Sequence, residues 1–135
     1  GLKNFSYLRE RPMLEVNQTL MRSHVLVNTS QYEGFPNTFI QAWFRRVPVV
    51  SLNVDPDDVL KTQGLGFHSV SFTNVVRDVK RLIEDRPLRE SMGERARKYA
   101  LEHHSMGPNI AKILALLTCP LKAVPRWLVT ADQSC

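Results

Sequence analysis

The chain has 135 residues, of which 43% are hydrophobic and 23% charged, which suits one globular domain with a moderate core. No apolar run approaches the roughly 18 residues of a membrane-spanning helix, and the first residues lack the apolar stretch of a secretory signal. The formal net charge of +5 is scattered without interleaved aromatic residues, which argues against nucleic acid and favours a solvated surface, with attraction to phosphates or an anionic membrane surface as the alternative.

The first half of the chain is predicted to alternate between strands and helices. A short strand is expected over residues 4–8 and a helix over 13–22. The apolar run over 24–28 is short, continuous and flanked by turn residues, which is typical of a strand buried on both faces of a parallel sheet. A second helix and a second buried strand, over 48–52, complete a strand–helix–strand unit that is normally right-handed. The apolar faces of the two helices comprise Leu14, Leu20 and Met21 in the first, and Phe39, Ile40, Trp43 and Phe44 in the second.

The second half opens on a helix with clear start and stop signals. Asp55 can cap this helix, Pro56 suits its first turn, and Gly64 or Gly66 can end it. A further strand is expected over 67–72. Strands and helices therefore keep alternating beyond the first strand–helix–strand unit.

The rest of the chain is predicted to be helical and then irregular. The remaining helices are expected over 75–83, over 85–104 as one or two helices, and over 109–117. We expect one domain over 1–117 and an irregular tail over 118–135, which contains two prolines and has no period. The succession of elements predicts an α/β fold built on an open parallel sheet.

The stretch YEGFPNTFIQAW, residues 32–43, joins the strand at 24–28 to the next helix. In an open α/β sheet, ligands bind beyond the carboxyl ends of the strands, where this loop is expected to lie. Gly34 permits a positive φ or the close approach of a ligand, and the amides at the helix start make an anion site. Glu33 would repel a phosphate, but its carboxylate is well suited to accept hydrogen bonds from sugar hydroxyls beside one.

A plainer interpretation of the same residues stays open. Thr38-x-x-Gln41 has the form of a capping box, in which Thr38 caps the helix and the Gln41 side chain reaches back to the Thr38 amide. Glu33 would then be an ordinary exposed loop residue.

Longer matches point to a family. Residues 25–60, VLVNTSQYEGFPNTFIQAWFRRVPVVSLNVDPDDVL, are followed by GLGFHS and then by LIEDRPLRESMGERARKYALEHHS. This combination resembles the C-terminal, nucleotide-sugar-binding domain of group-1 retaining glycosyltransferases, whose fold has two Rossmann domains. The resemblance covers residues 4–117. It implies a partial Rossmann-like parallel sheet flanked by helices, the C-terminal half of a two-domain glycosyltransferase.

The resemblance also implies a role for residues of the loop, because the family carries two glutamates separated by seven residues. Glu33 fills the first position and would be the catalytic contact to the hydroxyls of the transferred sugar. Backbone amides would line the sugar and diphosphate at Gly34, Phe35, Asn37 and Thr38. Gln41 fills the second position, which binds the ribose of the nucleotide. An amide there instead of a carboxylate weakens each such hydrogen bond by about 1 kcal/mol.

The implied activity is transfer of a sugar from a nucleotide-sugar donor to a polysaccharide or lipid-linked acceptor. The family implies no metal and no other cofactor, and no nucleic-acid partner is expected. Nothing before Phe5 supplies the family's Gly-containing loop or its Arg/Lys pair, and the chain begins with Gly1 rather than Met. We therefore expect a fragment, inactive alone, of an enzyme whose N-terminal domain binds the acceptor. The parent enzyme is expected in the cytoplasm, with peripheral association at the inner face of the membrane as the alternative.

Other functions remain open at this point. The chain can be a non-catalytic nucleotide-sugar-binding module, in which Gln41 marks lost activity, or part of a related sugar-nucleotide epimerase. Asp55-Pro56-Asp57 has the Asp-x-Asp form of a metal–nucleotide motif from a different glycosyltransferase fold, although its place between strand and helix favours a cap. The four histidines show no metal-ligand spacing, and the two cysteines make no disulfide framework.

Overall fold

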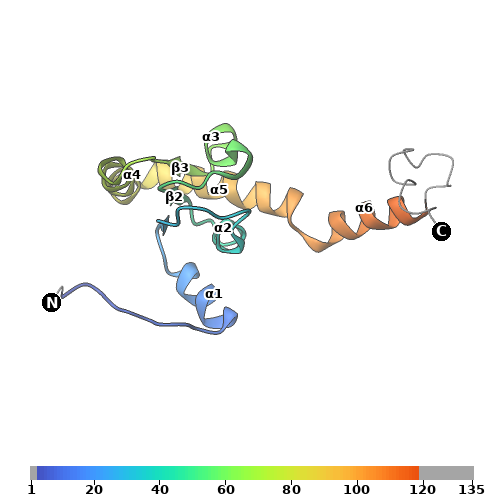
Figure 1. Cartoon of the computed structure of the whole chain (residues 1–135), viewed down its shortest axis with the longest axis horizontal. Coiled ribbons are helices and arrows are strands. Elements are labelled where there is room, and N and C mark those ends of the chain that lie inside the picture. Colours follow the sequence, from blue (N-terminus) through green and yellow to red (C-terminus); the bar gives the residue numbers. More distant parts are fainter. Residues whose placement is uncertain (1–2, 119–135) are drawn as a thin grey trace, which may run out of the picture.

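The computed structural model describes residues 3–118 and shows a sheet of three parallel strands in the order β1-β2-β3, with helices packed around it (Figure 1). The predicted α/β fold with a parallel sheet is therefore confirmed. The tail expected over 118–135 lies outside the described residues, apart from Thr118. The strands are β1 (Leu26–Asn28), β2 (Val49–Ser51) and β3 (Gly66–His68). The helices are α1 (Met13–Met21), α2 (Asn37–Trp43), α3 (Val59–Gln63), α4 (Phe72–Glu84), α5 (Arg86–His103) and α6 (Met106–Thr118), and a 3₁₀ turn, η1 (Pro56–Asp58), precedes α3.

The middle strand, β2, is buried on both faces, as its apolar sequence predicted. Val49 points to a core that contains Phe39 and Trp43 of α2. Val50 points to the opposite core, which contains Val75 and Leu82 of α4. Burying each of these apolar side chains contributes about 1.5–3 kcal/mol, so the two cores hold the sheet between α2 and α4.

Three expectations on the N-terminal side are wrong. Residues 4–8 form no strand, because this segment runs away from the sheet and meets no strand with which it could pair (Figure 1). β1 is an edge strand among the described residues, so Val27 remains 43% exposed rather than buried. In α1, Leu14 and Met21 are exposed and only Leu20 of the expected apolar face is buried, because this helix packs on α2 along a narrow stripe.

The signals at helix ends explain where the later elements begin and stop. Gly64 ends α3 in the left-handed conformation, at a φ of 63°, as one of the two expected glycines. The Ser71 side chain accepts a hydrogen bond from a first-turn amide of α4, so the strand expected over 67–72 already ends at His68. The Asp85 carboxylate caps α5 in the same way, and α5 is one continuous helix.

α6 confirms the helix expected over 109–117 and extends away from the rest of the domain (Figure 1). No helix in the described part of the chain is both long and apolar enough to span a membrane. The exposed apolar side chains of α6 include those of Met106, Ile110, Ile113, Leu116 and Leu117.

Candidate functional site

The three strands end together, and their last residues, Asn28, Ser51 and His68, lie in register side by side. We call this side of the sheet the carboxyl edge. The loops that leave β1 and β2 there enclose an open hollow of about 460 Å³, which we call the edge hollow. Open α/β sheets bind ligands at this edge. The lining comprises Gln31, Tyr32, Glu33 and Gly34 from the first loop, and Asn53, Val54, Asp55 and Pro56 from the second.

Glu33 is exposed at the hollow, and a neighbouring amide holds its carboxylate. The Asn28 side-chain nitrogen donates a hydrogen bond of 3.0 Å to Glu33 Oε1. Asn28 is buried at the end of β1, and its Oδ1 atom accepts from the Ser30 amide at 2.7 Å. Asn28 therefore fixes both the path of the chain after β1 and the position of the Glu33 carboxylate. Sequence reasoning missed Asn28, although a polar residue at the end of an apolar strand was a usable signal.

Gly34 leaves open space beside Glu33. A Cβ atom added to Gly34 would meet no heavy atom within 4 Å. Gly34 does not adopt a positive φ, which among the described glycines only Gly64 does, so of the two alternatives from the sequence only the close approach of a ligand remains. The absence of a side chain at position 34 instead keeps the backbone accessible to a ligand.

The capping box that the sequence offered as the alternative interpretation of Thr38 and Gln41 is absent. α2 begins at Asn37 after Pro36, and no side chain caps its first turn. Thr38 is therefore already inside the helix, where its side chain cannot fill the role of an N-cap. Gln41 is half-buried in the second turn, and its backbone carbonyl accepts a hydrogen bond from Arg45.

The structure brings only some of the predicted site residues to the edge hollow. Glu33 and Gly34 line it, whereas Phe35, Asn37, Thr38 and Gln41 do not. The Phe35 ring turns inward instead, 5.9 Å from the Trp43 ring in an edge-on contact and 5.1 Å from the His104 ring, between centroids. Any contact of Phe35 with a ligand is therefore left to its backbone.

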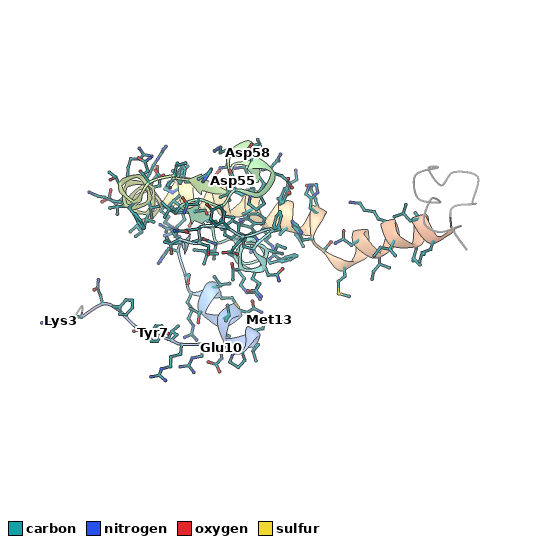
Figure 2. All side chains as sticks on the ribbon, in the orientation of Figure 1. Lys3, Tyr7, Glu10, Met13, Asp55 and Asp58 are labelled. Atoms are coloured by element: carbon teal, nitrogen blue, oxygen red, sulfur yellow. The ribbon has the colours of Figure 1, made fainter. Side chains whose placement is uncertain are left out.

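Asp55 acts as a helix cap, as its position after β2 predicted. Its carboxylate is 1% exposed, and Oδ1 accepts a 2.8 Å hydrogen bond from the Leu60 amide of α3. Asp55 and Asp58 lie beside each other on the loop that precedes α3, well separated from Met13 of α1 (Figure 2). No cluster of three or more histidine, cysteine or carboxylate side chains that could hold a metal occurs within residues 3–118.

The edge hollow has negative rather than positive charge. Its described lining carries the exposed carboxylate of Glu33 and no lysine or arginine, whereas the Asp55 carboxylate is turned away from solvent and 1% exposed. Three arginines, Arg45, Arg46 and Arg97, instead line a separate hollow of about 400 Å³ at the far end of α2. The described residues that line the hollow can therefore accept hydrogen bonds from hydroxyl groups through Glu33, but they include no lysine or arginine for a phosphate.

Comparison with known families identifies the class of protein. Over residues 1–99, the chain matches the family described as Glycosyl transferases group 1. The chain therefore belongs to this family, and the matched region is the C-terminal domain of the two-domain glycosyltransferase fold. Domains of this family bind nucleotide-sugar donors. Comparison with curated proteins and with solved structures gives no significant match.

Proposed function

We propose that this chain is the donor-binding part of a retaining glycosyltransferase that transfers a sugar from a nucleotide-sugar donor to a polysaccharide or lipid-linked acceptor. The observation that carries the proposal is the Glu33 carboxylate, held by Asn28 beside an open hollow at the carboxyl edge. A carboxylate in this position accepts hydrogen bonds from the hydroxyls of the transferred sugar. Such bonds to a charged acceptor contribute about 1.5–3 kcal/mol each.

The other donor-binding roles belong to residues between the hollow and the second turn of α2. Gly34 allows the donor to approach the backbone, because no atom lies within 4 Å of its missing side chain. Asn37 and Thr38 are exposed in the first turn of α2, where their backbone amides are free to bind the diphosphate together with that of Phe35. Gln41 faces the ribose from the next turn. The reaction is a front-face displacement, in which the sugar leaves the diphosphate and joins the acceptor on the same face.

The charge of the hollow limits what this chain does alone. Departure of the diphosphate requires stabilisation by positive charge, and no lining residue of the edge hollow supplies it. In the parent enzyme, the cation comes from an Arg/Lys pair in an upstream part of this same domain, and the acceptor site comes from an N-terminal domain. We expect the parent in the cytoplasm, with contact to the inner membrane face as the alternative, and this chain to bind donor weakly and not to catalyse transfer.

A second candidate function is favoured by the same lack of a cation. A non-catalytic module that binds a nucleotide sugar would need Glu33 for the sugar but no residue to stabilise a leaving group. Joined to its natural N-terminal sequence, an enzyme would release free nucleotide in the presence of acceptor. A binding module would hold the donor without turnover.

The test is calorimetric titration of the chain with uridine, guanosine and adenosine diphosphate sugars. We expect one of them to bind with a dissociation constant on the order of 0.1–1 mM, and Glu33→Gln to abolish the heat signal. Glu94→Gln is the matched control, because Glu94 is also an exposed carboxylate but pairs with Arg46 far from the hollow. Binding that survives Glu33→Gln unchanged would contradict the proposed site. Micromolar donor binding by the chain alone would contradict the proposal that the chain lacks a cation needed to bind the diphosphate tightly.

A further inference from the structure

A group of rings in edge-on and tilted contact includes Phe35, which follows Glu33 and Gly34 in the loop after β1. We call Phe35, Trp43, Tyr99, His103 and His104 the ring cluster. The His104 ring lies 5.1 Å from that of Phe35, 6.3 Å from that of Trp43 and 5.7 Å from that of Tyr99, between centroids. Tyr99 also makes an edge-on contact of 5.6 Å with Trp43 and a tilted contact of 4.4 Å with His103, between centroids. The cluster therefore joins the loop after β1 to α2 and to the end of α5.

The surroundings of His104 in this cluster favour its neutral form. It is half-buried, and burial is the main cause that lowers its pKa below the ordinary value of 6.5, with a smaller contribution from the neighbouring His103. Its Nε2 atom is buried without a hydrogen-bond partner among the described residues. Protonation would place a positive charge on a ring whose buried nitrogen has no acceptor in the described part of the chain, which disfavours the charged form.

The groups that face His104 do not compensate for a positive charge. Phe35 faces it from the loop, Trp43 from α2, and Tyr99 and His103 from α5. None of them is anionic near neutral pH, because burial raises the pKa of Tyr99 above its ordinary value of 10. Attraction between an imidazolium and these rings opposes the cost of burial but does not cancel it, since the pKa of His104 is lowered overall.

Phe35 connects this histidine to the donor site. It follows Glu33 and Gly34 in the chain, and its ring contacts both Trp43 and His104, so the ring anchors the loop to the interior. We propose that Phe35 and His104 are positioning residues, which hold the Glu33–Gly34 loop in its binding position only while His104 is neutral. Protonation of His104 then releases the loop and weakens donor binding. This inference rests on the proposed function for the identity of the ligand.

The direction of the pH dependence follows from linkage. Since the folded protein holds His104 with a lowered pKa, the unfolded chain binds more protons as the pH falls below 6.5. The stability that neutral His104 contributes is therefore fully present above pH 6.5 and is lost as the pH falls below it. If the donor binds only to the ordered loop, bound donor must in turn lower the pKa of His104 further, because coupling between two ligands is reciprocal.

The first experiment needs no donor. Nuclear magnetic resonance follows the His104 imidazole and the Gly34 amide between about pH 7.5 and about pH 5.5, where histidine titrates. We expect the Gly34 amide shift to change with the His104 titration and to stay constant in His104→Phe. His103→Gln is the control. It should keep the coupled change but move it to higher pH, because it removes the positive charge that lowers the pKa of His104.

The second experiment measures donor affinity at the two ends of that pH range by calorimetry. We expect an affinity loss of about fivefold at low pH in the unchanged chain, and no loss in His104→Phe or His104→Gln, the second of which guards against a misfolded phenylalanine variant. The inference is overturned if both variants lose as much donor affinity at low pH as the unchanged chain. It is also overturned if the chemical shift of the Gly34 amide does not change as His104 titrates. A Gly34 amide that follows His104 while no sugar nucleotide binds supports the coupling and rejects only the proposed function.

Discussion

The two ends of the sheet differ in how much room they leave. Where the strands begin, a Cβ atom on Gly66 would lie 1.9 Å from the Val49 carbonyl oxygen, and one on Gly93 would lie 2.3 Å from that of Arg46. At the carboxyl edge, a Cβ atom on Gly34 would touch nothing within 4 Å. Where the strands begin, the backbones of neighbouring elements thus pack too closely to admit another side-chain atom, whereas the carboxyl edge stays open. Substitutions where the strands begin should therefore change the stability of the fold, whereas substitutions at the carboxyl edge should change donor binding.

The largest expected effect comes from the same substitution made at both ends. Gly93→Ala forces α5 away from the turn before β2, and we expect a loss of about 2–3 kcal/mol in the free energy of unfolding, after the gain in helix propensity. Gly34→Ala should change this free energy by less than about 0.5 kcal/mol but weaken donor binding. Urea denaturation and donor titration measure the two quantities. Equal stability losses in Gly93→Ala and Gly34→Ala would show that the two ends of the sheet do not differ in this way.

The next largest effect is expected at the hydrogen bond that holds Glu33. Asn28→Asp replaces the amide donor by a second carboxylate 3.0 Å away, and the repulsion should lower the free energy of unfolding by about 2 kcal/mol at pH 7. The loss should shrink on acidification as one carboxylate takes up a proton. Adding Glu33→Gln restores a donor and should recover most of the stability. Thermal unfolding that is the same for Asn28→Asp at every pH would argue against the contact.

A smaller effect is expected at position 41. Gln41→Glu should tighten donor binding by about 1 kcal/mol, or fivefold, because a carboxylate accepts both ribose hydroxyls. The structure removes the rival explanation by a capping box, since no side chain caps α2. Stability should rise by only about 0.3–0.5 kcal/mol, through a new pair with Arg45 four residues later. The affinity should be measured on the full-length parent, and an unchanged value would exclude Gln41 from the site.

The smallest effect is expected where the chain turns from α2 into β2. Arg46 adopts a φ of 59°, a left-handed conformation that favours glycine. Arg46→Gly relieves this strain but loses an exposed ion pair with Glu94, so we expect a net gain of about 0.5 kcal/mol or less. Arg46→Ala loses the pair and keeps the strain, and its melting temperature should fall slightly. Donor affinity should stay constant in both, because this turn lies where the strands begin.

Much of the fold could be predicted from the sequence because its signals are local. The apolar run that became β2, the cap at Asp55 and the glycine that ends α3 each depend on neighbours within a few residues. The strand expected over 4–8 failed because a strand needs a partner, and none lies beside it. The exposure of Val27 likewise depends on which strand lies at the edge of the sheet.

The candidate site was predicted less completely, because its contacts join residues from different elements. The loop and Glu33 could be recognised from their order in the chain, but the bond from Asn28 to Glu33 depends on how the loop folds back over β1. The inward turn of Phe35 required His104, which lies 69 residues later, at the end of α5. Periodicity carries no information on such pairings.

Amide chemical-shift mapping shows whether the donor binds at the open end of the sheet. A nucleotide sugar is added to isotope-labelled chain, and the shifted amides are placed on the structure. If the donor binds there, we expect shifts in the two loops of the edge hollow, around Asn28, Glu33 and Gly34 and around Asp55, and none beside Gly93. Shifts centred on Arg45 and Arg97 at the far end of α2, or no shifts at all, would contradict donor binding at the open end.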